Sequence, residues 1–244
     1  MEGEGMIWNP WRGCHKVSDG CKYCYTHKGD IKRNMDTNQI IKTKDFYKPI
    51  EKKKDGSYKI APGSLVYVCF SSDFLIEEAD PWRMEAYLMM KERPDLHFLF
   101  LTKRIDRFYE VLPSDYTESL THLTIGVSVE NQEQADKRLV FFSKLPIKHK
   151  NIICQPLIGP INLEPYLNGV ELVVVGGEQD TNARPLDYNW VLGIKEVCIK
   201  KNVSFSFRQC GTHFIKDGVS YQIPTRELMK QARKASIDYV ALKE

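Results

Sequence analysis

The sequence has no long apolar run, little net charge and no internal repeat, low-complexity tract or domain linker. No stretch approaches the roughly 20 consecutive apolar residues of a membrane-spanning helix. The 35 basic and 32 acidic residues leave a net charge of +3. A strong general attraction to nucleic acid or to an anionic membrane is therefore not expected. Residues 1–244 are expected to form a single domain.

An export signal is also missing, because Met1–Gly5 is acidic and no apolar core segment follows it. The chain nevertheless contains seven cysteines. Cysteines without an export signal predict a protein of the reducing cytoplasm. Cys69, Cys154 and Cys198 lie in apolar segments and are expected to be small buried side chains.

Short apolar runs alternate with helical patterns along the chain. The runs are mostly continuous, which predicts strands covered on both faces. They start roughly 20 to 32 residues apart, about the length of one βα unit. Repeated βα units imply parallel strands, so we expect an α/β fold with a parallel (β/α) barrel or partial barrel of six to seven strands. A flat doubly wound sheet is the alternative. The expected strands are 6–8, 65–70, 97–101, 123–127, 151–154, 171–175 and 203–207.

The segments between these runs carry helix signals. Asp80 and Pro81 predict a helix start, with the helix reaching about Lys91. Asn131 followed by Gln134 resembles a capping box. The other signals are the apolar stripes Ala135-Leu139-Phe142 and Trp190-Ile194-Val197 and a cap at Thr225 for a helix ending near Lys234.

Three cysteines, Cys14, Cys21 and Cys24, occupy one loop after the first expected strand. They cannot all pair as disulfides, and three thiolates leave a tetrahedral metal or a cubic iron–sulfur cluster one ligand short. A cluster with an open position can bind and activate a second molecule. Zinc is an alternative, because Cys21 and Cys24 have a zinc-knuckle spacing and His15 or His27 would add a fourth ligand.

Aromatic residues surround this loop and favour the iron–sulfur interpretation. Such a shell would keep a cluster dry and offer a flat surface to an aromatic ligand, although the same side chains also suit a core. The aromatic residues are Trp8, Trp11, Tyr23 and Tyr25.

A series of ordered motifs covers nearly the whole chain: Trp8–Cys14, Gly20–Tyr25, Ser72–Phe74, Leu101–Arg104, Gly126–Asn131, Pro156–Pro160, Val175–Glu178 and Ala183–Pro185. With these motifs the chain resembles the radical S-adenosylmethionine superfamily, and more closely a phage- and prophage-associated family of radical-SAM-like proteins. The spacing between Cys14 and Cys21 is longer than in the superfamily's usual loop but suits the closer family. That family is expected to have Glu at Gln155 and an aromatic at Cys210, so the roles of these two residues stay open.

The resemblance implies a [4Fe–4S] cluster on Cys14, Cys21 and Cys24, S-adenosyl-L-methionine on its open iron, and an external electron donor. Reduction of the cluster would cleave the sulfonium and give a 5′-deoxyadenosyl radical that abstracts hydrogen from a substrate. Its implied cofactor contacts are Tyr23 to adenine, Ser72 and Asp73 to the ammonium, Lys103 or Arg104 to the carboxylate, Ser128 and Glu130 to the ribose, and also Gln155 and Glu178.

Substrate contacts are expected from Glu178, Arg184 and Arg208. Two arginines favour an anionic substrate such as a nucleotide or nucleic acid, because guanidinium groups bind phosphate in a fork. A surface ion pair is the alternative for Arg184. Gly176-Gly177 would let a ligand approach the backbone, or would form an ordinary strand-to-helix turn. His213 is a candidate proton donor, with a structural histidine as the alternative.

The competing function is a non-catalytic zinc or iron–sulfur module that binds nucleic acid. It would use the basic segment Lys42–Lys59, for which a solvated insertion is the alternative. This segment lies within the lysine-rich residues 38–63, which break the βα pattern and carry the turn signal Lys54–Ser57 of a hairpin or insertion. Its aromatic residues Phe46, Tyr47 and Tyr58 would stack on bases. A third hypothesis, a cluster-dependent nucleic-acid lyase or repair enzyme, combines the first two. The sequence specifies neither the substrate nor the oligomeric state.

Overall fold

The computed structural model describes residues 5–242, so Met1–Glu4 of the acidic start, together with Lys243 and Glu244, lie outside the described residues. The chain forms two compact units. The first runs up to Lys16 and takes up Tyr25–Gly126 and Pro146–His149. The second holds Val17–Cys24, Val127–Leu145 and the chain from Lys150 onward. The prediction of one domain stays a prediction, because each unit is assembled from several separate stretches of the chain.

The first unit contains four strands of the large sheet, in the order β1-β4-β5-β6. Strands β2 and β3 form a separate antiparallel pair. The elements are β1 (Met6–Trp8), β2 (Trp11–Arg12), α1 (Tyr25–Lys32), β3 (Ile41–Lys42), η2 (Lys48–Ile50), β4 (Leu65–Val68), η3 (Glu77–Ala79), α2 (Asp80–Glu92), β5 (His97–Thr102), η4 (Ile105–Arg107), α3 (Phe108–Val111), α4 (Tyr116–Ser119) and most of β6 (Leu123–Ser128).

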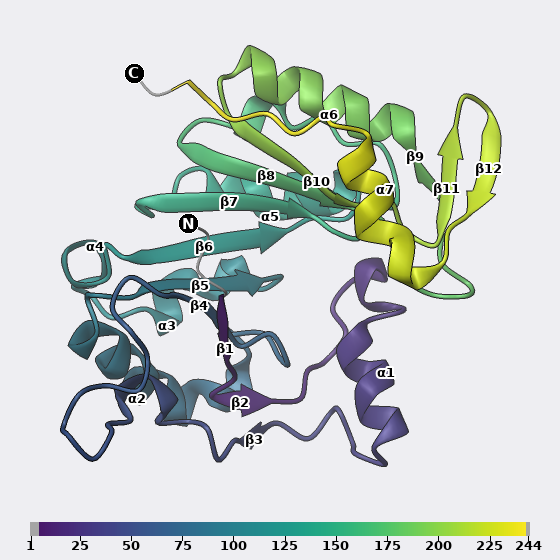
Figure 1. The fold of residues 1–244 in the computed structure, drawn as a ribbon. Helices are drawn as coiled ribbons and strands as arrows, with labels where there is room; N and C mark the ends of the chain where they lie inside the picture. Colours follow the sequence, from purple (N-terminus) through teal and green to yellow (C-terminus); the bar gives the residue numbers. More distant parts are fainter. Residues whose placement is uncertain (1–4, 243–244) are drawn as a thin grey trace. The chain divides into compact units, whose positions relative to one another are not determined.

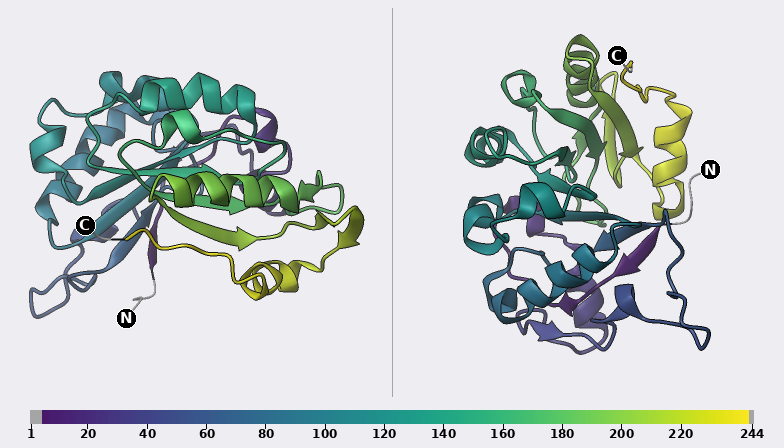
Figure 2. Two further views of the ribbon diagram at one scale, coloured as in Figure 1. Left: turned by 90° about the horizontal axis from the view of Figure 1, so that it is seen from above. Right: turned by 90° about the vertical axis from the view of Figure 1, so that its left-hand side faces the viewer.

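The second unit continues the strand order from the end of β6 as β6-β7-β8-β10 and adds a small sheet, β12-β11-β9. Helices α6 and α7 both pack against β10 (Figures 1 and 2). The elements are η1 (Asp19–Cys21), α5 (Gln132–Phe142), β7 (His149–Cys154, from Lys150), η5 (Glu164–Tyr166), β8 (Val170–Gly176), β9 (Leu186–Asp187), α6 (Tyr188–Lys200), β10 (Ser204–Gln209), β11 (His213–Lys216), β12 (Val219–Gln222), η6 (Thr225–Glu227) and α7 (Leu228–Lys234).

The predicted α/β class is confirmed. Neighbouring strands are parallel in the pairs β1–β4, β4–β5, β7–β8 and β8–β10. The seven strands follow one another in chain order, with no point at which the order reverses. A doubly wound sheet requires such a reversal, so the flat alternative is wrong. Strands β1 and β10 stand at the two ends of the order, which is consistent with a partial barrel.

The expectation of strands covered on both faces holds for β6 and β7, whereas β4, β5 and β10 alternate buried and more exposed side chains. In β6, Leu123 and Ile125 through Ser128 are all buried. In β7, every residue from Lys150 to Cys154 is buried. The first strand β1 is confirmed, and β4 ends at Val68, before Cys69 and Phe70 of the expected run.

One helix start follows its sequence signal closely, and a second, for which Asp80 was the expected cap, follows it only in part. Asn131 caps α5, with its side chain accepting a hydrogen bond from the backbone N–H of Gln134. Ala135, Leu139 and Phe142 then form the buried stripe. Helix α2 begins at Asp80, but Ala79 is its cap residue, because the Asp80 carboxylate pairs with arginines instead.

Two predicted helix features, the buried face of α6 and the start of α7, lie a few residues from their expected positions. The buried face of α6 is Val191, Ile194 and Cys198, and Trp190 is only half-buried. Thr225 begins the 3-10 helix η6, and α7 starts at Leu228 and ends at Lys234 as expected.

The lysine-rich segment 38–63 does contain a hairpin, in which Lys52 and Tyr58 form an antiparallel bridge. Phe46 is only 1% exposed and accepts, through its carbonyl, a hydrogen bond from the Trp8 indole. Tyr58 packs on the guanidinium of Arg93 at 4.0 Å. The prediction that Phe46 stacks on a base is therefore wrong, because its ring belongs to the core.

Among residues 5–242, no helix has both the length and the apolar character needed to cross a membrane.

Candidate functional site

Three acidic side chains follow the C-terminal ends of strands, and each is paired with an arginine. Asp73 follows β4, Glu130 follows β6 and Glu178 follows β8. Their exposed fractions are 5%, 0% and 4%. A buried carboxylate is stable only when it is paired and hydrogen-bonded. The pairs are Asp73–Arg104 in the first unit, and Glu130–Arg138 and Glu178–Arg184 in the second.

The first pair fixes Cys14. Arg104 lies 3.0 Å from Asp73 Oδ2, donates to the carbonyl of His15 at 3.0 Å and places Nη1 3.9 Å from Cys14 Sγ. Burial alone lowers the pKa of Arg104, but Asp73 and Cys14 together raise it above its usual value. A fixed positive charge beside a sulfur favours the thiolate form.

Both carboxylate oxygens of Asp73 already accept hydrogen bonds from donors in the same unit. Its Oδ1 accepts from the Thr102 hydroxyl at 2.7 Å and from the N–H of Leu75 at 2.9 Å. Its Oδ2 accepts from the N–H of Lys103 at 2.9 Å and pairs with Arg104. The expected contact between Asp73 and a cofactor ammonium would have to compete with these bonds.

The second pair supports the middle of the cysteine loop. Arg138 donates to Glu130 Oε2 at 3.1 Å and to the carbonyl of Ser128 at 2.7 Å. Glu130 Oε1 accepts from the Ser18 hydroxyl at 2.9 Å. Gly20 packs directly on this carboxylate, since a Cβ there would lie 2.2 Å from Glu130 Cγ. Glu130 is therefore covered by the cysteine loop, and its side chain has no exposed surface that could contact a ribose.

The third pair holds the next part of the loop. Glu178 accepts from the Nε of Arg184 at 3.0 Å and from its Nη2 at 2.5 Å. The same guanidinium donates to the carbonyl of Asp19 at 2.8 Å and lies 6.0 Å from the ring centre of Tyr23. Arg184 thus forms the ion pair that sequence reasoning kept as its alternative, although it bridges two segments instead of standing alone on the surface.

Cys21 and Cys24 lie in a run of tight turns. The N–H of Cys21 donates to Ser18, that of Lys22 to Asp19 and that of Cys24 to Cys21. In such turns, side chains three positions apart point the same way. The spacing of Cys21 and Cys24 therefore brings two thiols to one side of the loop.

The other expected contacts have structural partners. The Ser72 hydroxyl donates to the carbonyl of Gly13. Ser128 is 5% exposed and holds Arg138 through its carbonyl. The Gln155 side chain packs on Gly176, where a Cβ would lie 2.8 Å from its Cδ.

Gly177 is required by the chain's own backbone, since a Cβ there would lie 2.7 Å from the carbonyl oxygen of Cys210. A ligand was expected to approach the backbone of Gly176-Gly177 closely. The group that lies close to Gly177 is instead the chain's own backbone at Cys210. His213 donates through Nε2 to the carbonyl of Thr181 at 2.9 Å, as a structural histidine would. Arg208 is exposed on β10.

The two histidines of the zinc alternative differ in environment. His15 lies 2.5 Å from Glu78 Oε1, so one of its nitrogens is engaged. Burial first, and then the nearby Lys16, lower the pKa of His27, a shift toward the neutral form in which an imidazole binds a metal.

The donor set fits an iron–sulfur cluster by its chemistry. All seven cysteines lie in the described part of the chain and none is in a disulfide. Cys14, Cys21 and Cys24 are half-buried, whereas the other four are buried, as was expected of Cys69, Cys154 and Cys198. Within residues 5–242 no three His, Cys, Asp or Glu side chains are already gathered for a metal ion. The fit rests on the three accessible thiols and on the Arg104 N–H groups near Cys14.

Sequence reasoning missed Arg138, Ser18 and Gly20 as parts of this site. Arg138 did leave a signal, because it falls next to Leu139 on the apolar stripe of α5, where a charge is unusual. Ser18 and Gly20 look like ordinary loop residues in the sequence.

The exposure of the cysteines predicts two classes of thiol reactivity. In metal-free protein at pH 8, iodoacetamide should modify Cys21 and Cys24 within minutes and leave Cys210 and Cys198 unmodified for much longer. Burial raises the pKa of Cys210 to about 11 and that of Cys198 to about 12. Since the thiolate is the nucleophile, only about one Cys210 in a thousand would be reactive at that pH. Peptide mass spectrometry measures each rate, and equal rates for Cys210 and Cys21 would contradict the burial described here.

Comparison with known proteins adds a family but no function. No curated protein and no solved structure matches this sequence. Residues 3–239 match the family described as "Protein of unknown function (DUF5131)". Because that match covers nearly the whole chain, this protein belongs to the DUF5131 family.

Proposed function

We propose that this protein is a radical S-adenosylmethionine enzyme in which Cys14, Cys21 and Cys24 hold a [4Fe–4S] cluster. One observation carries the proposal: three arginine–carboxylate pairs anchor the loop that bears these thiols. Each carboxylate follows the C-terminal end of a strand, which is where α/β proteins with parallel strands bind ligands. The same proposal includes two expectations from the family resemblance: that the partial barrel is of the radical-SAM type, and that the protein is associated with phages or prophages.

Burying three ion pairs is costly unless the arrangement they fix is needed. Removing two charges from water carries a large desolvation penalty, and apolar residues of similar size often stabilise a fold as well. Buried ionic groups therefore serve best where one geometry must be selected. Here the selected geometry is that of the cysteine loop, whose carbonyls and serine hydroxyl accept or donate the remaining bonds.

In this proposal the chain's residues have distinct tasks. The three cysteines are ligands, and Arg104 donates toward the sulfur of Cys14 and so tunes its charge. Asp73, Glu130 and Glu178 are positioning residues that act through their arginines. When bound, the cluster and S-adenosyl-L-methionine would supply one-electron chemistry that generates a radical for hydrogen abstraction. The direct cofactor contacts that we retain are Tyr23, Ser72, Lys103, Ser128 and Gln155.

The proposed substrate is anionic, with a nucleotide or nucleic acid as the class. Arg184 is engaged with Glu178, so the exposed guanidinium of Arg208 is now the better candidate for an anionic group. An external electron donor completes the reaction.

The metal content of anaerobically purified protein tests this proposal. We expect about four irons and four sulfides per chain, as a [4Fe–4S] cluster requires. Cys14→Ser, Cys21→Ser and Cys24→Ser should each lose the iron, because each removes one of only three thiolate ligands. Cys198→Ala is the matched control, since Cys198 is buried in α6 and should not affect iron.

Two further measurements separate the alternatives. Stoichiometric zinc without sulfide would replace the iron–sulfur assignment with the zinc module. Addition of S-adenosyl-L-methionine to the reduced protein should change its electron paramagnetic resonance spectrum and yield 5′-deoxyadenosine. An iron–sulfur protein that shows neither response would be a cluster protein without radical chemistry.

A further inference from the structure

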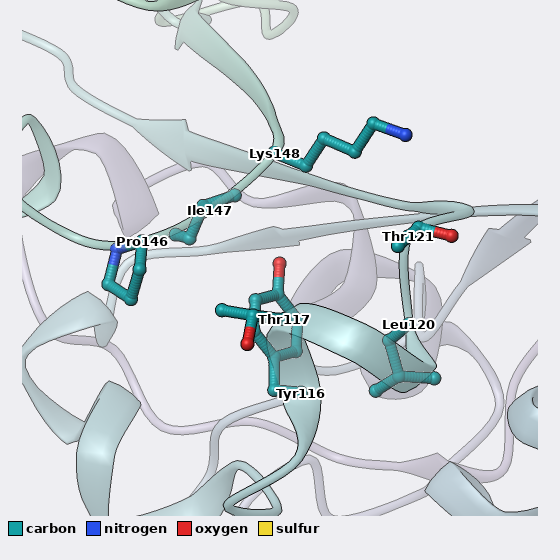
Figure 3. Close-up of a pocket in the computed structure, with 7 residues that line it drawn as sticks. All are labelled: Tyr116, Thr117, Leu120, Thr121, Pro146, Ile147 and Lys148. Atoms are coloured by element: carbon teal, nitrogen blue, oxygen red, sulfur yellow. The ribbon is translucent and has the colours of Figure 1, made fainter.

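A hollow of about 280 Å³ lies in the first unit. Its lining comes from two segments that precede strands: α4 with the turn before β6, and the segment before β7 (Figure 3). Cys14 and Asp73, in contrast, follow the C-terminal ends of β1 and β4. The proposed function makes no use of this hollow. The lining residues are Tyr116, Thr117, Leu120, Thr121, Pro146, Ile147 and Lys148.

Tyr116 gives the hollow an unused hydrogen-bond donor. Its side chain is 5% exposed, and its ring packs edge-on against Phe108. Among the described residues its hydroxyl is buried and has no hydrogen-bond partner. Figure 3 shows the hydroxyl directed toward the space that the lining residues surround. A buried donor without a partner costs free energy, so an acceptor atom of a ligand that reaches this hydroxyl would be stabilised by it.

The rest of the lining selects the kind of ligand. Leu120, Pro146 and Ile147 provide apolar walls, and the threonines provide hydroxyls. Lys148 is the only charged side chain of the lining. The nearby carboxylate of Asp115 is engaged 2.7 Å from the ammonium of Lys91. Glu118 adds a carboxylate on α4 but does not line the hollow, so the one charge on the lining is the ammonium of Lys148, which favours an anionic group on a compact apolar body.

We propose that this hollow binds a small organic anion, in which a carboxylate or phosphate oxygen meets Lys148 and an acceptor atom meets the hydroxyl of Tyr116. The volume suits a ligand of this size, because about nine waters would fill it at roughly 30 Å³ each. The apolar body of the ligand lies against Leu120 and Ile147. This site is independent of the cluster and of radical chemistry.

Titration of the full chain with benzoate and with phenyl phosphate tests the proposal, using ligand-observed NMR. At least one of the two should bind saturably, and the better one identifies the anionic group. Tyr116→Phe and Lys148→Ala should each weaken that binding about tenfold, the usual effect of losing one charge-assisted hydrogen bond. Tyr87→Phe is the matched control, because the Tyr87 hydroxyl is also buried without a partner but does not line the hollow.

Three results would overturn the proposal. They are no saturable binding of either anion, equal affinity for neutral benzyl alcohol, and equal affinity in Tyr116→Phe and Tyr87→Phe. A second measurement does not need a ligand. Tyr116→Phe should unfold at the same temperature as the parent protein or higher, because it removes an unsatisfied donor. A clear fall in Tm would mean that the hydroxyl already has a partner in the free protein, which the proposal excludes.

Discussion

Glu130→Ala is expected to lower the free energy of unfolding by about 3–5 kcal/mol, the usual cost of breaking a buried ion pair. Glu130 is fully buried, and Arg138 beside it has a side chain only 6% exposed. The variant would leave the guanidinium of Arg138 without its carboxylate, and the Ser18 hydroxyl without its acceptor. Urea unfolding of the metal-free protein, followed by circular dichroism under reducing conditions, measures this change.

Two further variants identify the cause of that loss. Glu164→Ala removes a carboxylate from an exposed pair with Lys200 and should cost at most about 1 kcal/mol. The double variant Glu130→Ala with Arg138→Met removes both charges and should recover part of the stability, because no uncompensated charge remains. Equal losses for Glu130→Ala and Glu164→Ala would show that the buried pair does not hold the fold.

The same pair shows what the sequence reveals of the site. The acidic residues after β4, β6 and β8, which are Asp73, Glu130 and Glu178, were among the expected cofactor contacts. Their partners were not recognised. A carboxylate in a polar motif has the same sequence appearance whether it faces a ligand or an arginine. Arg104 lies far along the chain from Asp73, and only the folded sheet brings them within 3.0 Å.

The fold was more predictable than the site, for a physical reason. Continuous apolar runs and side-chain caps such as Asn131 act locally, so short stretches of sequence contain them. The small sheet of β9, β11 and β12 was missed because its strands are two to four residues long, and β12 is exposed along its whole length. Strands that short and exposed leave no apolar pattern to detect.

Gly13→Ala is expected to cost about 2–5 kcal/mol, since it adds a left-handed backbone penalty to a steric clash. Gly13 has φ +92°, and a Cβ there would lie 2.4 Å from the backbone carbonyl oxygen of Gln39. That carbonyl is not the end of a flexible side chain, so the cysteine loop itself would have to move. Urea unfolding measures the cost, and iron content after anaerobic purification reports the displacement of the adjacent Cys14.

Gly63→Ala separates the two contributions to that cost. Gly63 also has a positive φ, +78°, but a Cβ there meets nothing within 4 Å. Its substitution should therefore cost only the backbone penalty of about 1–2 kcal/mol and leave the iron content unchanged. If both variants lost the same stability and kept their iron, the clash with Gln39 would be absent and Gly13 would not position Cys14. A larger loss in Gly13→Ala, together with lower iron, would tie the conformation of this glycine to the cysteine that follows it.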